Sequence, residues 1–236
     1  MTTMIRSHVP PGAGAPFTPS VVGIYDDFIT GSISGTVDAA RWLLTGTSAT
    51  AVIKNSARAT DLKAGPGVLT LSSNTTNQAS LQLNGEPFRL VTGKRLWAGC
   101  RLALNDVDAT QLWFGLSLED VTLLAGQPSD YVGFLNTAAT NVINAGSAKN
   151  SSATLTDTGK TWGTTDATFR VLTLEWNGQN RLTYFVNGEQ VHQSIVSNIE
   201  NTNNLPNDED MTLGVEILGA AGESAEIDYI YCFMER

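Results

Sequence analysis

Apolar residues alternate with polar or small residues over several stretches of the chain, which is the pattern of β-strands with one buried face. In Leu96–Leu104, one face would carry the side chains of Leu96, Ala98, Cys100, Leu102 and Leu104. In Phe169–Trp176, Leu172, Leu174 and Trp176 would lie on one face, opposite Val171, Thr173 and Glu175. Leu69 and Leu71 likewise share a face. The dominant period of two predicts strands, and no segment makes a convincing helix.

Turn signals separate these segments, and Asn-Gly pairs are the strongest of them. They occur at Asn84-Gly85, Asn177-Gly178 and Asn187-Gly188, each directly after a predicted strand. About a dozen short strands without a helix indicate an all-β, two-sheet antiparallel β-sandwich. The predicted strands are Ile24–Phe28, Arg41–Leu44, Ala51–Lys54, Val68–Leu71, Ala79–Leu83, Phe88–Leu90, Leu96–Leu104, Gln111–Leu118, Tyr131–Leu135, Phe169–Trp176, Arg181–Val186, Gln190–His192, Met211–Leu218 and Glu226–Phe233.

The first 22 residues differ from the rest because they are rich in proline and show no periodicity. Such a segment gains little from folding alone. We therefore predict an extended N-terminal arm over residues 1–22, followed by one jelly-roll domain over residues 23–236. Two polar stretches, Asn136–Trp162 and Ser197–Asp210, are predicted to be long loops or irregular hairpins.

Composition narrows the possible functions. The chain has 23 Asp and Glu against 14 Lys and Arg, a formal net charge of −9. Binding to nucleic acid or to an anionic membrane needs a basic surface, so neither partner is predicted. Met1–Phe17 lacks the apolar segment of a secretory signal, which argues against signal-directed secretion. Charged residues make up only 16% of the chain, which suits a protein that covers part of its surface with neighbouring subunits.

Residues that could hold a metal or act as nucleophiles are sparse. Cys100 and Cys232 lie in apolar strand patterns and are predicted to be buried as small hydrophobic residues. The two histidines are His8, in the arm, and His192, at the end of a predicted strand. No cofactor is predicted. Calcium stays an open alternative to solvated loop acids at Asp106 with Asp108, and at 208–210.

Three local patterns together resemble the concanavalin-like (laminin G-like) jelly-roll proteins, and most closely a group of structural proteins of tailed bacteriophages. They are Tyr25–Phe28 followed by Trp42, Leu182–Val191, and Ile227–Tyr231. The resemblance covers residues 24–236. It implies a virion protein made in the host cytoplasm, most simply a capsid decoration (cement) protein. Such a protein would contact the major capsid protein and form a homotrimer.

Glycoside hydrolases of the same fold class carry Glu-x-Asp-x-Glu on one strand. Their chemistry needs two carboxyl groups on one face, about 5–10 Å apart. Here Glu226-Ile227-Asp228 supplies the first two acidic positions, but the third is Ile230. On this ground the sequence predicts that the protein is not an enzyme.

Partner contacts are predicted in the arm, at Pro10, Pro11, Pro16, Phe17 and Pro19, and at Trp162. Trp162 stands in a polar stretch, so an exposed indole is expected there, whereas Trp113 and Trp176 are expected in the core. An exposed indole serves a protein interface or a sugar ring equally well. The alternative function is therefore a carbohydrate-binding module on a phage fibre or tail that recognises host glycans.

Overall fold

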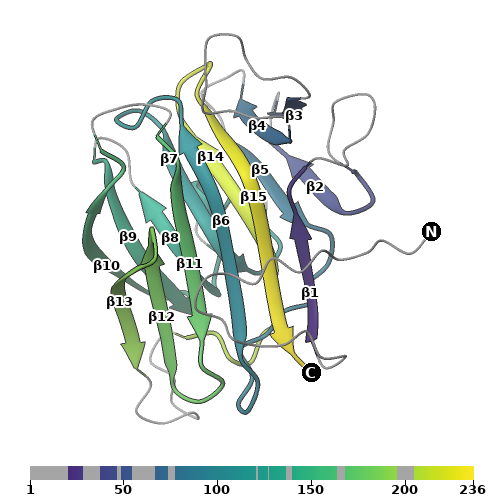
Figure 1. Ribbon diagram of the computed structural model, residues 1–236, viewed down its shortest axis with the longest axis vertical. Coiled ribbons are helices and arrows are strands. Elements are labelled where there is room, and N and C mark those ends of the chain that lie inside the picture. The colour runs from purple at the N-terminus through teal and green to yellow at the C-terminus, as the bar shows by residue number, and fades with distance from the viewer. Residues whose placement is uncertain are drawn as a thin grey trace.

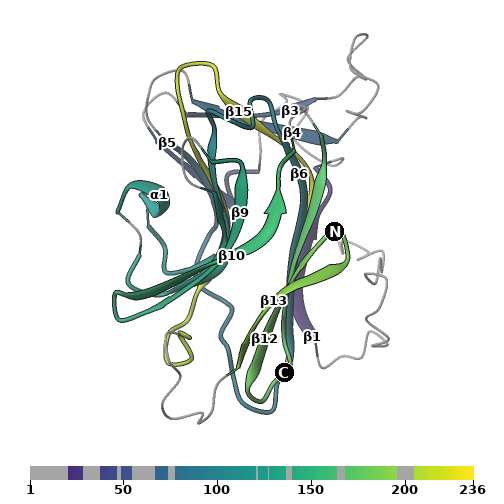
Figure 2. The same ribbon diagram turned by 90° about the vertical axis from the view of Figure 1, so that its left-hand side faces the viewer.

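Two antiparallel sheets packed face to face form the protein, as the computed structural model shows for residues 21–28, 38–46, 49–54, 67–73, 78–120, 122–126, 128–136, 140–163, 168–195 and 205–236 (Figure 1). The predicted all-β antiparallel sandwich is confirmed. In the view of Figure 2 the two sheets are seen from the side, with the short helix α1 (Leu123–Gly126) outside the seven-stranded sheet. No helix in the described ranges is long and apolar enough to span a bilayer.

The eight-stranded sheet faces the viewer in Figure 1. Its strands, in spatial order, are β13 (Glu189–Ile195), β12 (Arg181–Val186), β11 (Arg170–Trp176), β6 (Leu96–Leu104), β15 (Ser224–Glu235), β4 (Val68–Ser73) and β3 (Ala49–Lys54), and β1 (Val21–Asp26) also pairs with β15. The strand β15 is long enough to pair with β4 through its first half and with β1 through its second half.

The seven-stranded sheet lies behind it. Its spatial order is β10 (Ser152–Thr161), β9 (Val142–Lys149), β8 (Tyr131–Asn136), β7 (Gln111–Ser117), β14 (Thr212–Leu218), β5 (Gln78–Leu83) and β2 (Trp42–Thr45). Sequential strands often lie in different sheets, so most pairs join segments that are distant in the chain.

The predicted buried faces fill the space between the sheets. The five apolar residues of β6 from Leu96 to Leu104 belong to the main core, as do Leu172, Leu174 and Trp176 of β11. Leu69 and Leu71 join them from β4. Cys100 and Cys232 are free, buried thiols in this core. Period-two alternation therefore identified the inward faces correctly, because burying one face is what fixes the register of a strand.

Two of the three Asn-Gly hairpins are confirmed. Asn177-Gly178 joins β11 to β12, and Asn187-Gly188 joins β12 to β13. Asn187 has φ 52° and Gly188 φ 80°, the left-handed conformations that a tight hairpin turn needs. Asn84-Gly85 follows β5 but makes no hairpin, because the next strand, β6, belongs to the other sheet.

The polar stretch Asn136–Trp162 is more regular than a long loop. It contains β9 and β10, which pair with a register shift between Asp157 and Lys160, so the irregular hairpin is the correct alternative. Most of Ser197–Asp210 lies outside the described residues. The first described strand begins at Val21, and residues 1–20 of the predicted arm lie outside them as well.

Candidate functional site

The outer face of the seven-stranded sheet has a row of four glycines at its centre. Gly214 of β14 pairs with Gly115 of β7, Gly115 pairs with Gly133 of β8, and Gly133 pairs with Gly146 of β9. Their chain neighbours, such as Val215, Phe114 and Phe134, point into the core between the sheets. The glycines therefore point outward and leave a band across four strands without side chains of its own.

Glu216 lies beside this band, two residues along β14 from Gly214. Ser80 of β5 and Trp113 of β7 are its direct neighbours across the strands. The Glu216 side chain is fully buried, at 0% exposure. Its Oε2 accepts a hydrogen bond from the backbone N–H of Leu123 at 3.0 Å, and its Oε1 accepts one from Leu124 at 2.8 Å. The carboxyl group thereby holds α1 against the sheet.

Burial raises the pKa of Glu216 to about 7. The cause is the loss of water around the carboxylate, and the nearby Asp120 carboxylate raises the pKa further. The two backbone N–H groups of α1 act in the opposite direction because they stabilise the charged form. A carboxyl group tuned close to neutral pH can donate a proton or accept one.

Two more buried polar side chains lie beside Glu216. Gln82 is the cross-strand partner of Gly214 on β5, and its Oε1 accepts a hydrogen bond from the backbone N–H of Asp120 at 3.3 Å. Its Nε2 has no hydrogen-bond partner among the described residues, and neither does the indole Nε1 of Trp113. A buried donor without a partner is uncommon and calls for an explanation.

Apolar side chains cover the rest of this face. Trp113 packs with Leu123, Tyr131, Leu135 and Ala148 in a second cluster, separate from the main core. Trp113 is therefore buried, as predicted, but it does not lie in the core between the two sheets. Its indole is buried on the outer side of the seven-stranded sheet. Trp176 does belong to the main core.

Trp162, the predicted partner-binding residue of the domain, is not at the surface. Its side chain is 1% exposed and belongs to the main core. The expectation of an exposed indole is wrong because the polar stretch around it forms a strand whose end turns this residue inward. Its backbone N–H donates to Asn141 and its carbonyl accepts from Arg170. The other predicted contacts, Pro10, Pro11, Pro16, Phe17 and Pro19, lie outside the described residues.

The acidic pair Glu226 and Asp228 lies on the other sheet. Glu226 and Asp228 belong to β15, where a register shift separates Ile227 from Tyr229. Asp228 forms an ion pair with Arg101 of β6. His192 is half-buried next to Ser194, whose hydroxyl lies 3.2 Å from its Nε2. Burial lowers the pKa of His192.

The acidic loops have partners of their own. Asp106 accepts hydrogen bonds from the backbone N–H groups of Asp108 and Ala109. Asp208 forms an ion pair with Lys149 at 3.0 Å. No group of three or more His, Cys, Asp or Glu suited to a metal ion occurs within the described ranges.

Sequence reasoning missed Glu216. The signal was present, because one charged residue interrupts the apolar stretch Met211–Leu218 at a position that alternates with buried residues. A buried charge is rare unless it is paired or used. The sequence could not indicate that Gln82, from a strand more than 130 residues earlier, would lie beside it.

Comparison with known proteins shows which solved structures share this two-sheet β-sandwich fold. No protein-family model matches the chain, and no curated protein does. Among solved structures, it is similar to an endo-1,3-β-glucanase from Streptomyces sioyaensis, with a TM-score of 0.63 and 12% identity over 94% of this chain and 99% of the glucanase.

Two further structures illustrate the range of this class. SCLam, a non-specific endo-β-1,3(4)-glucanase from family GH16, has a TM-score of 0.59 and 14% identity over 94% of each chain. The carbohydrate recognition domain of Emp47p has a TM-score of 0.58 and 15% identity over 91% of this chain and 94% of that domain. At these identities the likeness establishes the fold alone.

These neighbours contradict the prediction of a non-enzymatic protein. That prediction followed from Ile230 on β15, a strand of the eight-stranded sheet. Endo-β-glucanases with the same architecture are enzymes, and the carboxyl group with a strongly raised pKa lies on the other sheet, at Glu216. The residues of one strand therefore do not exclude an enzyme, and the prediction is wrong on this point.

Proposed function

We propose that the protein binds carbohydrate on the outer face of the seven-stranded sheet, at the site formed by Glu216, Gln82 and Trp113. The observation that carries the proposal is the pair of buried N–H donors, on Gln82 and Trp113, that lack partners beside a buried carboxyl group. The coarser carbohydrate assignment is supported by neighbours that are glucanases and a carbohydrate recognition domain.

A sugar has the chemistry that this site lacks. Each hydroxyl both donates and accepts a hydrogen bond, so one hydroxyl can accept from Gln82 while another donates to Glu216. The glycine band beside them is buried, with the side chain of Gln82 over Gly214 and that of Leu135 over Gly146, so a sugar ring would reach its backbone only after these side chains move. The indole of Trp113 adds an apolar surface with one polar N–H.

The helix α1 covers this site, because Leu123 is fully buried and both Leu123 and Leu124 donate backbone hydrogen bonds to Glu216. Binding therefore requires α1 to move off the sheet. The helix has only four residues, and the two hydrogen bonds to Glu216 are the contacts a hydroxyl-rich ligand could replace.

Hydrolysis of the bound glycan is the second candidate function, and the pKa of Glu216 favours it. A glycosidase needs one carboxyl group that is protonated near neutral pH and a second that is ionised. Glu216 has the raised pKa, and Asp120 is the carboxylate close enough to contribute to it.

Calorimetric titration with soluble β-1,3-glucan, mixed-linkage glucan and α-glucan tests the binding proposal. Trp113→Phe removes the N–H and keeps an aromatic ring, and we expect it to weaken binding about tenfold. Trp97→Phe, which alters a tryptophan on the other sheet, is the matched control and should leave affinity unchanged. If no glucan binds, or if both variants bind as the parent does, the proposal is wrong.

A reducing-end assay on the same glucans tests hydrolysis. Glu216→Gln keeps the shape of the side chain but cannot transfer the proton, so release should fall at least a hundredfold while binding persists. Release that is unaffected by Glu216→Gln would exclude this carboxyl group as the acid. A glucan that binds and is never cleaved would leave the binding proposal standing and refute the hydrolytic one.

The virion setting stays a prediction from the sequence resemblance. It comprises a location on the particle surface, contact with the major capsid protein and a homotrimer. The alternative setting, a module on a phage fibre or tail, fits the proposed glycan binding directly.

A further inference from the structure

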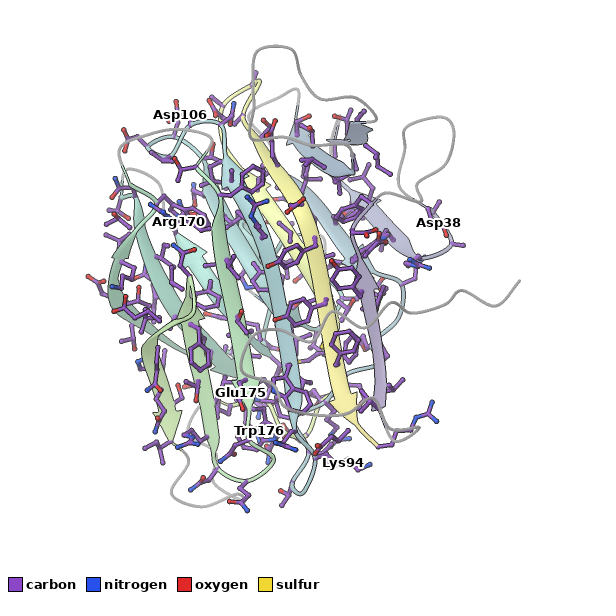
Figure 3. The ribbon with its side chains drawn as sticks, in the orientation of Figure 1. Asp38, Lys94, Asp106, Arg170, Glu175 and Trp176 are labelled. Carbon is purple, nitrogen blue, oxygen red and sulfur yellow. The ribbon has the colours of Figure 1, made fainter. Side chains whose placement is uncertain are left out.

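The outer face of the eight-stranded sheet, on the opposite side of the molecule from Glu216, carries a continuous group of aromatic rings. The aromatic platform consists of Tyr25 from β1, Trp97 from β6, and Tyr229, Tyr231 and Phe233 from β15. This face is turned toward the viewer in Figure 3, with Glu175 and Trp176 marking the end of β11 nearby.

The rings are arranged as a sheet of near-parallel planes. Tyr229 and Tyr231 have centroids 6.3 Å apart and planes at 27°, and Tyr231 and Phe233 are 5.7 Å apart at 26°. Tyr25 adds a neighbour to Tyr229 at 6.1 Å and 23°. Centroids this far apart with planes this close to parallel mean that the rings lie beside one another rather than face on face.

Two glycines make room for this arrangement. A Cβ on Gly99 would come within 2.6 Å of the ring of Tyr231, and one on Gly23 would overlap the ring of Phe233. The rings therefore lie down over the neighbouring strands and do not stand upright on the sheet. The result is a low apolar layer on the outside of a sheet whose inner face already packs in the core; Tyr231 and Phe233 are buried within this layer, whereas Tyr25, Trp97 and Tyr229 are half-buried.

We propose that the proline-rich segment Pro10–Pro19 of the same chain docks on the aromatic platform. The argument begins with where that segment is attached. The chain enters the fold at Val21, which pairs with Glu235, and Gly23 pairs with Phe233. The platform therefore starts beside the point at which the arm joins the sheet.

The lengths agree with docking within one chain. Tyr229 to Phe233 spans four residues of strand, about 13 Å. Pro10 to Val21 spans eleven residues, which reach about 34 Å when extended. The arm can therefore turn back and cover the platform with several residues to spare.

The chemistry agrees as well. Proline-rich segments bind to surfaces lined with aromatic rings, because the preformed extended chain loses little entropy and the flat rings accommodate proline. The segment supplies Pro10, Pro11, Pro16 and Pro19, together with Phe17. Because the tether is short, the effective concentration of the segment at the platform of its own chain is near the millimolar range. This is well above the concentration of the same segment from a second copy in dilute solution.

Photo-crosslinking in the full chain tests the docking. Benzoylphenylalanine replaces Phe17, the protein is irradiated, and the crosslinked residue is located by mass spectrometry. We expect crosslinks to Trp97, Tyr229, Tyr231 or Phe233. An equal mixture of light and heavy isotope-labelled protein shows whether the segment docks on its own chain or on a second copy. Crosslinks within one chain join two light peptides or two heavy peptides, whereas crosslinks between copies also join a light peptide to a heavy one.

Two variants of the platform, Tyr229→Ala and Trp97→Ala, should each lower the crosslink yield at least fivefold. The matched control is Ile195→Ala, which removes an apolar side chain that is 64% exposed on β13 of the same sheet and should leave the yield unchanged. Crosslinks to other surfaces, predominant light–heavy pairs, or equal yields in all three variants would each overturn the proposal. Glucan binding at Glu216 is a separate measurement, so either proposal can fail alone.

Discussion

The Asp26 carboxylate accepts a hydrogen bond from the indole Nε1 of Trp42 at 2.9 Å, and this contact joins the two sheets. Asp26 ends β1 in the eight-stranded sheet, whereas Trp42 begins β2 in the seven-stranded sheet. The same carboxylate accepts from the backbone N–H of Phe28 at 2.9 Å and from Arg41 at 3.2 Å. One buried side chain thus holds the start of the fold to both layers.

Removing this carboxylate should destabilise the protein. Asp26→Ala leaves the buried donors of Trp42 and Phe28 without a partner, so we expect the free energy of unfolding to fall by roughly 2–4 kcal/mol. Asp26→Asn keeps one acceptor oxygen but turns its NH2 group toward the donor or donors served by the other oxygen, so it should still lower the free energy of unfolding by about 1–3 kcal/mol. Urea unfolding followed by circular dichroism measures both. The exposed Glu209→Ala is the control, and equal midpoints for it and Asp26→Ala would refute the role of the network.

Glu216 should make stability depend on pH in a specific window. Its pKa is about 7 in the folded protein against 4.5 for the free side chain. Between these values the folded state holds a proton that the unfolded state has released, so the free energy of unfolding falls as pH rises from about 4.5 to 7. The total change is about 3 kcal/mol from this one group.

The comparison of Glu216→Gln with the parent isolates that contribution, because other titrating groups cancel in the difference. Glutamine cannot ionise, so the variant should lose less stability than the parent on going from pH 5 to pH 8. Urea unfolding at the two pH values measures the difference. Parallel pH dependence in parent and variant would mean that the carboxyl group titrates normally and that burial does not raise its pKa.

The sequence was informative wherever a local rule decides the structure. Alternation placed Cys100 and Leu174 in the core, and Asn187-Gly188 fixed a hairpin, because both signals depend on a few adjacent residues. It failed where distant strands decide. The polar neighbours of Trp162 predict a loop residue at the surface, yet Trp162 directly follows β10 and is packed into the core. The surroundings of Glu216 come from strands far apart in the chain, so no local pattern could assemble them.

Two glycines of ordinary strand conformation, Gly115 of the glycine band and Gly99 of β6 in the other sheet, differ in what an added methyl group would meet. A Cβ on Gly115 would overlap the carbonyl oxygen of Val132 and lie 2.6 Å from the Cα of Gly133, both of which are backbone atoms. The atoms nearest to a Cβ on Gly99 would be those at the outer end of the Tyr231 ring. Backbone in a paired strand cannot shift without breaking the ladder, whereas a ring end can swing aside.

Gly115→Ala should therefore lower the free energy of unfolding by more than about 2 kcal/mol, and Gly99→Ala by about 1 kcal/mol or less. The urea midpoints of the two variants measure the difference, and near-ultraviolet circular dichroism follows the displaced tyrosine in the second. The order is the critical result. If Gly99→Ala were the more destabilising change, the prediction would be wrong. The ring of Tyr231 would then resist displacement more strongly than the paired backbone of β7 and β8 does.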